Sequence, residues 1–223
     1  MSKKSKFKYL KNANEIESEL NLNEKQKDYL KELGNIGWGH AISSLSFLLN
    51  EPIKLSLTDV KVIPFWELPN VLGGPGVEVF AIFSKGKGEP NLSFLQFYTK
   101  ESIINLLNFF SDKDKKIQKL DTLEDLDESA IDTITEIGNI IAGNYVSALA
   151  NLLSIKLILD VPDLIFDYIG AIADGLIAKY SEYTNSIILI TTDACIQKLN
   201  LNGVFCFFPS LNNLEGLFKP LNE

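Results

Sequence analysis

The chain has 223 residues, of which 46% are hydrophobic and 22% are charged. This composition excludes wholesale disorder and allows one large domain or two small ones. The formal net charge of −8 disfavours nucleic acid and anionic membranes as partners. All 21 cationic side chains are lysines, so an arginine finger and a bidentate arginine clamp are excluded from any mechanism.

The chain lacks signals for membrane insertion and for a metal site. No apolar run approaches the ~20 residues that span a bilayer, and no apolar segment follows the lysine-rich start. Cys195 and Cys206 do not have the spacing of a zinc site. We therefore expect a cytoplasmic protein that holds no metal of its own.

The first half of the chain is predicted to be a helix followed by strands. Residues 1–22 combine several lysines with an acidic stretch and are predicted to be a mobile arm before a folded domain over 23–223. Asn23, with Gln26 three residues later, is typical of a capped helix start, and this helix is expected to end near Asn50. The following elements are predicted as strands over 53–63, 77–83 and 92–98, turns over 73–76 and 85–90, and a helix over 101–110.

The second half is predicted to repeat this order after a charged connector over 111–125. Its expected elements are a helix over 127–153, a strand over 155–161, a helix over 164–180, strands over 186–192 and 203–208, and a short terminal helix.

The two long helices are related by an internal duplication. A shift of 104 positions, from Glu32 to Glu136, superposes ten identical residues. Helical periodicity would match apolar classes, but it need not match Asp, Glu and Asn. The sequence therefore predicts an α+β fold with approximate two-fold symmetry, in which half-units over about 23–115 and 120–223 form an antiparallel sheet that carries two long helices.

Each long helix repeats the pattern D-x-x-x-E-x-x-N, followed by a glycine. A helical wheel places these four residues within about 60° of one another. They are Asp28, Glu32, Asn35 and Gly39 in the first copy, and Asp132, Glu136, Asn139 and Gly143 in the second. The opposite face of the first helix is expected to pack on the core through Leu30, Leu33, Gly37, Ala41, Ser44 and Leu48. The polar stripe should therefore face solvent or a partner.

An ordinary solvated helix face would also produce such a stripe. Two features favour a function instead. Asparagine is a mediocre residue in a helix interior, and an exposed glycine costs about 1 kcal/mol relative to alanine. A glycine there would let a partner's backbone approach closely. A carboxamide can also orient a water for in-line attack on a phosphoryl group, provided that the substrate brings its own metal.

The segments Glu32-Leu-Gly-Asn-Ile-Gly-Trp-Gly-His40 and Glu136-Ile-Gly-Asn-Ile-Ile-Ala-Gly-Asn144 resemble the signature of the CheC, CheX and FliY chemotaxis phosphatases. The family pattern, D/S-x-x-x-E-x-x-N, continues with 22 residues and a proline. The second copy has this proline at Pro162, whereas the first has Thr58 at the equivalent position. Two motif copies in one chain are similar to CheC rather than to CheX.

The resemblance implies a phosphatase that hydrolyses the aspartyl phosphate of a CheY-like response regulator in two-component signalling. It implies that Asn35 and Asn139 orient the attacking water and that Glu32 and Glu136 pair with the receiver lysine. Asp28 and Asp132 would support docking, together with the exposed glycines. Mg²⁺ would come with the receiver, so no cofactor of the chain's own is implied.

The resemblance also implies a second partner, a CheD-like receptor deamidase. The segment that would bind it is 164–180, with Asp167 as the candidate contact. An alternative from a different class is a non-catalytic adaptor, which would use the stripes only to dock such a deamidase or a flagellar switch component. A third possibility is a purely structural helix-and-sheet module that does not bind a receiver.

Overall fold

The computed structural model describes residues 22–50, 52, 54–55, 59–88, 92–111, 116–182, 186–192, 194–195, 203–209, 218 and 221. The predicted arm, apart from Leu22, and the predicted terminal helix lie outside the described residues.

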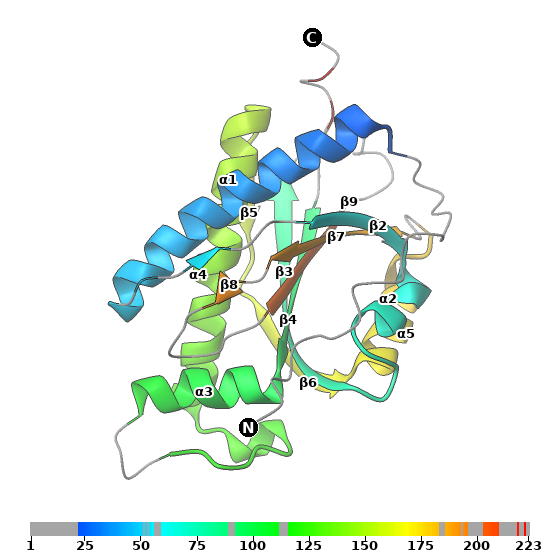
Figure 1. Cartoon of the computed structure of the whole chain (residues 1–223). Helices are drawn as coiled ribbons and strands as arrows, with labels where there is room; N and C mark the ends of the chain where they lie inside the picture. The colour runs from blue at the N-terminus through cyan, green and yellow to red at the C-terminus, as the bar shows by residue number, and fades with distance from the viewer. Residues whose placement is uncertain are drawn as a thin grey trace.

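A seven-stranded sheet forms the centre of the molecule (Figure 1). Its strands are β2 (Asp59–Pro64), β3 (Glu78–Gly88), β4 (Leu92–Thr99), β5 (Leu157–Leu159), β6 (Asp163–Tyr168), β7 (Ser186–Thr192) and β9 (Gly203–Pro209). They follow the order β2-β7-β9-β4-β3-β5, and β6 also pairs with β3. Every pairing between described strands is antiparallel. A separate short pair joins β1 (Lys54–Leu55) to β8 (Ala194–Cys195).

The strand order shows the two-fold relation that the duplication predicted. The central pair joins β4 from the first half to β9 from the second. On one side β7 and then β2 follow β9, and on the other side β3 and then β6 follow β4. Exchanging the two halves leaves this order unchanged. The predicted fold class is confirmed: an α+β domain with an antiparallel sheet and two long motif-bearing helices.

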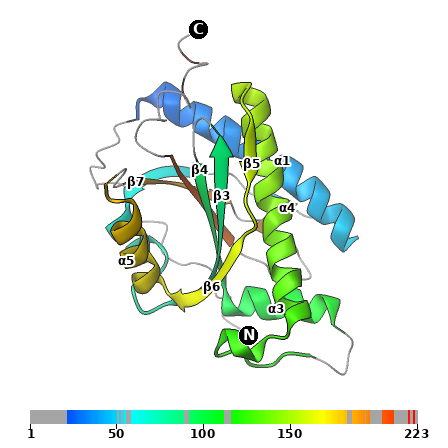
Figure 2. The same cartoon turned by 180° about the vertical axis from the view of Figure 1, so that it is seen from behind.

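Helices cover both faces of the sheet (Figures 1 and 2). On one face, α1 (Glu24–Leu49), α3 (Lys100–Phe110) and α4 (Glu128–Leu153) enclose a core with Phe80, Phe94 and Phe205. The other face packs against η2 (Phe65–Glu67), α2 (Leu68–Val71) and α5 (Ile169–Tyr180). Because both faces are covered, every side chain of β4 from Leu92 to Tyr98 is buried.

The ends of the two long helices follow from local sequence signals. The Asn23 side chain accepts a hydrogen bond from the Gln26 N–H at 2.9 Å, and the Gln26 side chain accepts one from the Asn23 N–H at 2.9 Å. Asp127 likewise accepts from the Ala130 N–H at 2.8 Å. Both helices have 26 residues and end at a left-handed residue, Asn50 or Ser154. The predicted capping box is confirmed.

The two long helices contact each other closely where they cross. Gly37 of α1 lies against the ring of Tyr145 of α4, and a Cβ at Gly37 would be 2.4 Å from Tyr145 Cδ2. The Tyr145 ring is itself fixed, because it is fully buried and its centroid lies 4.5 Å from that of Phe205. The Ser44 hydroxyl adds a hydrogen bond to Asn144 Oδ1 at 3.2 Å. The orientation of both motif helices is therefore set by a small-residue contact.

Three predicted elements differ in the structure. The helix predicted over 164–180 begins only at Ile169, because residues 163–168 form β6 along β3. The turn predicted over 85–90 is wrong for residues 85–88, where β3 continues between β4 and β5. Of the strand predicted over 155–161, only residues 157–159 form a strand, β5, which pairs with β3. The turn over 73–76 is confirmed, with positive φ at Gly73 and Gly74.

Candidate active site

The polar stripes lie on the outer faces of α1 and α4. The charged and amide residues of both copies are exposed: Asp28, Glu32, Asn35, Asp132, Glu136 and Asn139. A Cβ added at Gly39 or Gly143 would meet no atom within 4 Å, so open space lies above both glycines. Within the described part of the chain, the side chains of Asn35 and Asn139 make no hydrogen bond. Each amide is therefore available to bind a water and a partner group.

The inner face of α4 is fixed to the sheet next to Asn139. A Cβ at Gly138 would be 2.5 Å from Ile82 Cδ1, so the helix backbone lies directly on β3. The buried Gln96 amide on β4 donates to the Gly138 carbonyl oxygen at 2.8 Å, and the Tyr98 hydroxyl donates to Gln96 Oε1 at 2.8 Å. This chain of buried hydrogen bonds holds the Asn139 backbone in a fixed position relative to the sheet.

A hollow of about 440 Å³ lies beside Asn139. Its lining combines the motif with the end of a strand: Thr135, Glu136, Asn139, Leu159, Asp160, Val161 and Pro162. The structure thus brings the predicted Glu136 and Asn139 together with Pro162, which the sequence pattern associates with them. The first copy has Thr58 at that position, which lies outside the described residues.

The sequence did not reveal the break between β5 and β6 that forms the other wall of this hollow. The Asp160 N–H donates to the Lys85 carbonyl at 2.8 Å, and Lys87 Nζ lies 2.6 Å from Asp160 Oδ1. These contacts hold Asp160 against β3, whereas the next residue, Val161, is 88% exposed. The available signal was Pro162, which has no N–H for a sheet hydrogen bond and therefore favours a strand break.

The two stripes differ in their charge. In the first copy Asp28 Oδ1 lies 3.9 Å from Lys31 Nζ, and α1 carries three lysines with its three carboxylates. α4 carries three carboxylates and no lysine. In the described residues the side chains of Asp132 and Glu136 enter no ion pair. The second site therefore offers the stronger attraction for a cation.

Two predictions about individual residues need correction. Leu48 was expected to pack on the core, but it is 45% exposed, because Leu45 and Leu49, each 3% exposed, take the core-facing side of the end of α1. Asp167 was expected on a helix, but it lies exposed on β6, where its Oδ1 accepts from the Tyr168 N–H at 2.7 Å. The cross-strand partner of Asp167 is Val79. The role of Asp167 as a partner contact stays a prediction.

The described residues hold no group of three or more His, Cys, Asp and Glu side chains that could bind a metal ion. None of the helices in the described ranges is long and apolar enough to cross a bilayer. What the stripes offer is a pair of carboxylates and a free amide on a rigid support. This arrangement can bind a cation and orient a water.

The chain is similar in sequence to known proteins. Residues 130–165, which contain the second motif and Pro162, match the family described as "CheC-like family". The chain is 31% identical over 207 residues to a protein named CheY-P phosphatase CheC from Bacillus subtilis (strain 168), covering 90% of this chain and 95% of that protein. It is also 31% identical over 71 residues to the flagellar motor switch phosphatase FliY of the same organism, which is 32% of this chain and 19% of FliY.

A solved structure supports the same fold. The crystal structure of Thermotoga maritima FliY superposes with a TM-score of 0.70 at 16% identity, covering 91% of this chain and 98% of that one. The high coverage shows that the arrangement of sheet and helices is shared over nearly the whole described domain. With the extensive identity to the Bacillus protein, it follows that the chain belongs to the CheC-like family.

Proposed function

We propose that the chain is a phosphatase that hydrolyses the aspartyl phosphate of a CheY-like receiver. The observation that carries the proposal is the presentation of two Glu–Asn pairs, Glu32 with Asn35 and Glu136 with Asn139, on exposed helix faces. The name of the Bacillus relative, a CheY-P phosphatase, supports the substrate.

In the proposed reaction, Asn35 or Asn139 enters the receiver's cleft and holds a water in line with the phosphorus. The water oxygen forms a bond to phosphorus while the bond to the aspartyl oxygen breaks. The carboxylate leaves, and the protons of the water remain with inorganic phosphate. Glu32 or Glu136 pairs with a receiver lysine, which fixes the position of the amide. Mg²⁺ bound by the receiver neutralises the phosphoryl charge.

Turnover tests this proposal. A catalytic amount of the chain, mixed with phosphorylated cognate receiver and Mg²⁺, should release phosphate over many turnovers and faster than the receiver alone. Removing Mg²⁺ with a chelator should stop the release, because the metal belongs to the substrate. Tight binding with an unchanged rate of decay would refute the proposal and favour the adaptor.

Gly143→Ala should separate stability from activity. Alanine is about 1 kcal/mol better than glycine in a helix interior, and the added Cβ meets open space, so the free energy of unfolding should rise by up to about that amount. The methyl group would stand where the receiver's backbone approaches, and we expect kcat/KM to fall about tenfold. Urea unfolding and phosphate release measure the two effects. An unchanged kcat/KM would show that the receiver does not approach Gly143.

A further inference from the structure

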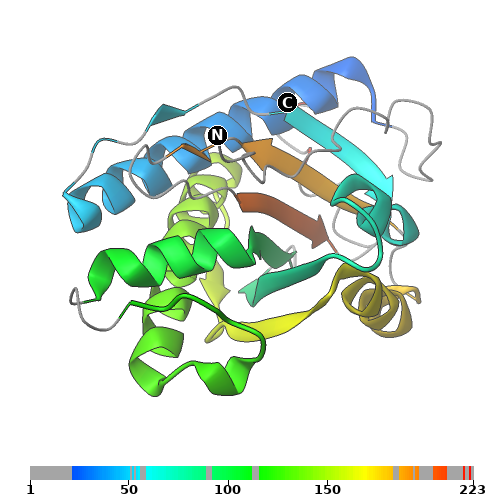
Figure 3. The ribbon, with the colours of Figure 1, turned by 60° about the horizontal axis from the view of Figure 1, so that its bottom comes forward.

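A groove continues from the second stripe toward the N-terminal end of α4. Apart from Asp132 and Glu136, its lining has no part in the proposed chemistry. The part nearer Glu136, of about 590 Å³, lies between α1, α3 and α4. It is lined by Leu48, Phe110, Glu128, Ser129, Asp132, Thr133, Glu136 and Ile137. Figure 3 shows α3 beside the N-terminal half of α4, on the same side of the sheet as the C-terminal end of α1. Glu136 lines both this groove and the hollow that contains Asn139.

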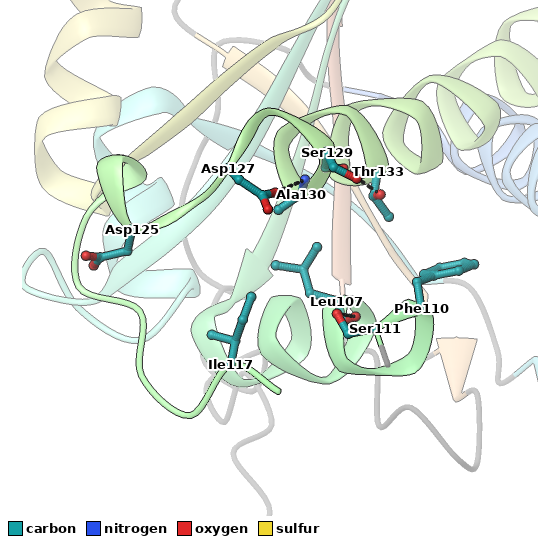
Figure 4. A pocket seen from close by; sticks show the side chains of 9 residues that line it. All are labelled: Leu107, Phe110, Ser111, Ile117, Asp125, Asp127, Ser129, Ala130 and Thr133. Atoms are coloured by element: carbon teal, nitrogen blue, oxygen red, sulfur yellow. Dashed lines mark hydrogen bonds between the residues drawn. The ribbon is translucent and has the colours of Figure 1, made fainter. Parts of the chain in front are cut away.

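The part nearer the N-terminus of α4 has a volume of about 410 Å³. Its lining shares Phe110, Ser129 and Thr133 with that of the part nearer Glu136. Figure 4 shows Leu107, Phe110 and Ile117 of one wall opposite Asp127, Ser129 and Thr133 of the other. We call the combined depression the α3–α4 groove. It forms one continuous surface from the N-terminus of α4 to the second Glu–Asn pair.

One wall of the α3–α4 groove is apolar and incompletely covered. Leu48 and Phe110 are each 45% exposed and lie in the last turns of two different helices, α1 and α3. The Phe110 ring makes an edge contact with Phe109, with their centroids 5.3 Å apart. Apolar side chains left open beside a polar rim are typical of an interaction site.

The other wall is acidic. The Asp125 carboxylate accepts hydrogen bonds from the backbone N–H groups of Asp121 and Thr122, and the Asp127 carboxylate accepts one from the N–H of Ala130. In contrast, Glu128, Asp132 and Glu136 make no side-chain hydrogen bond or ion pair within the described residues. No lysine of the described chain lines the groove. An occupant should therefore present positive charge next to an apolar side chain.

We infer that the α3–α4 groove is a second contact region for the receiver, and that it accepts a receiver segment in which apolar and basic side chains lie side by side. The inference rests on the proposed function, because the occupant is the same receiver that Asn139 acts on. Continuity through Glu136 favours this occupant: a receiver whose cleft covers Asn139 extends over the adjoining groove. The groove then contributes to affinity and to choice of receiver, and not to the chemical step.

Binding and turnover test the inference separately. Affinity is measured by calorimetry with receiver that carries beryllofluoride in place of the phosphoryl group, and kcat and KM by phosphate release. Phe110→Ser and Leu48→Ser should each weaken binding and raise KM about tenfold, because each removes an apolar side chain that contacts the receiver. The value of kcat should stay unchanged. Glu128→Gln should weaken binding about threefold at low ionic strength and have no effect at high salt.

Two matched controls lie away from the groove. Trp66 is an aromatic residue that is 54% exposed on η2, on the opposite face of the sheet, so Trp66→Ser should leave affinity and KM unchanged. Glu182 is an exposed acid that follows α5, so Glu182→Gln should likewise have no effect. Equal thermal midpoints would show that all of the variants fold.

The outcomes distinguish this inference from the proposed function. If receiver binding depends on Phe110 and Leu48 but no turnover is seen, the proposed phosphatase activity is refuted and the groove is supported as a receiver contact. Normal turnover in both groove variants, with affinity within twofold of the unchanged chain, would overturn the groove alone. A rise in turnover would overturn it in favour of the chain's own lysine-rich residues 1–21 as occupant. A dimer of the unchanged chain in sedimentation analysis that Phe110→Ser abolishes, with receiver binding unchanged, would overturn it in favour of a second copy.

Discussion

The double variant Asn35→Ala, Asn139→Ala is expected to lose the acceleration of phospho-receiver decay, with kcat/KM falling by at least about a hundredfold. Both amides are exposed and make no hydrogen bond within the described chain, so their removal should not affect folding. The physical reason for the loss is that no other group of the stripe can accept from and donate to the attacking water at once. Phosphate release under multiple-turnover conditions measures the effect.

The single variants should divide the activity between the sites. α4 has three carboxylates and no lysine, whereas α1 balances its three carboxylates with three lysines. A receiver lysine should therefore prefer the second site, and Asn139→Ala alone should remove the larger share of turnover. Asn105→Ala, on α3, serves as a control for amide loss elsewhere. Full activity in the double variant would contradict the assigned role of both amides.

Gly37→Ala should lower the free energy of unfolding by about 1 to 3 kcal/mol, because it overpacks the contact between the two long helices. The new Cβ would be 2.4 Å from Tyr145 Cδ2. The Tyr145 ring cannot move away easily, since it is buried against Phe205 and Phe207. The helices would have to separate, which should also shift the Glu–Asn pairs and lower turnover. Urea denaturation followed by circular dichroism measures the stability.

Gly39→Ala is the matched control for that prediction, two residues further along the same helix. A Cβ at Gly39 meets no atom within 4 Å, so this variant should gain up to about 1 kcal/mol from helix propensity. Opposite signs for the two substitutions would show that the cost at Gly37 comes from the helix contact. A stabilising Gly37→Ala would mean that Tyr145 is not fixed.

The elements that the sequence predicted well are those with local signals. The capping residues Asn23 and Asp127 define the starts of α1 and α4, and the duplication predicted that the two helices would match. The strand β6 was missed because Leu164 to Tyr168 is a short apolar run, which periodicity cannot assign to a helix or a strand. Its conformation depends on pairing with β3, where Phe166 stacks on Phe80 with centroids 4.6 Å apart. That contact joins distant parts of the chain.

The same distinction applies to the site. A helical wheel was sufficient to predict that Asn35 and Asn139 face outward, because the stripe is a property of one helix. It could not show that Asp160 and Val161 complete the hollow, since their position depends on contacts of Asp160 with Lys85 and Lys87. Nor could it show that Leu48 stays exposed while Leu45 and Leu49 are buried, which depends on the sides of α1 that other elements cover.

The interruption at Asp160–Pro162 has a further consequence for association between molecules. β5 and β6 form the outer edge of the sheet along β3, and an unprotected edge can template the addition of foreign strands and aggregation. Residues 160–162 separate β5 from β6 and so interrupt this edge, and Pro162 has no N–H that a foreign strand could bind. The geometry that opens the site next to Asn139 therefore also shortens the stretch on which a misfolded neighbour could nucleate.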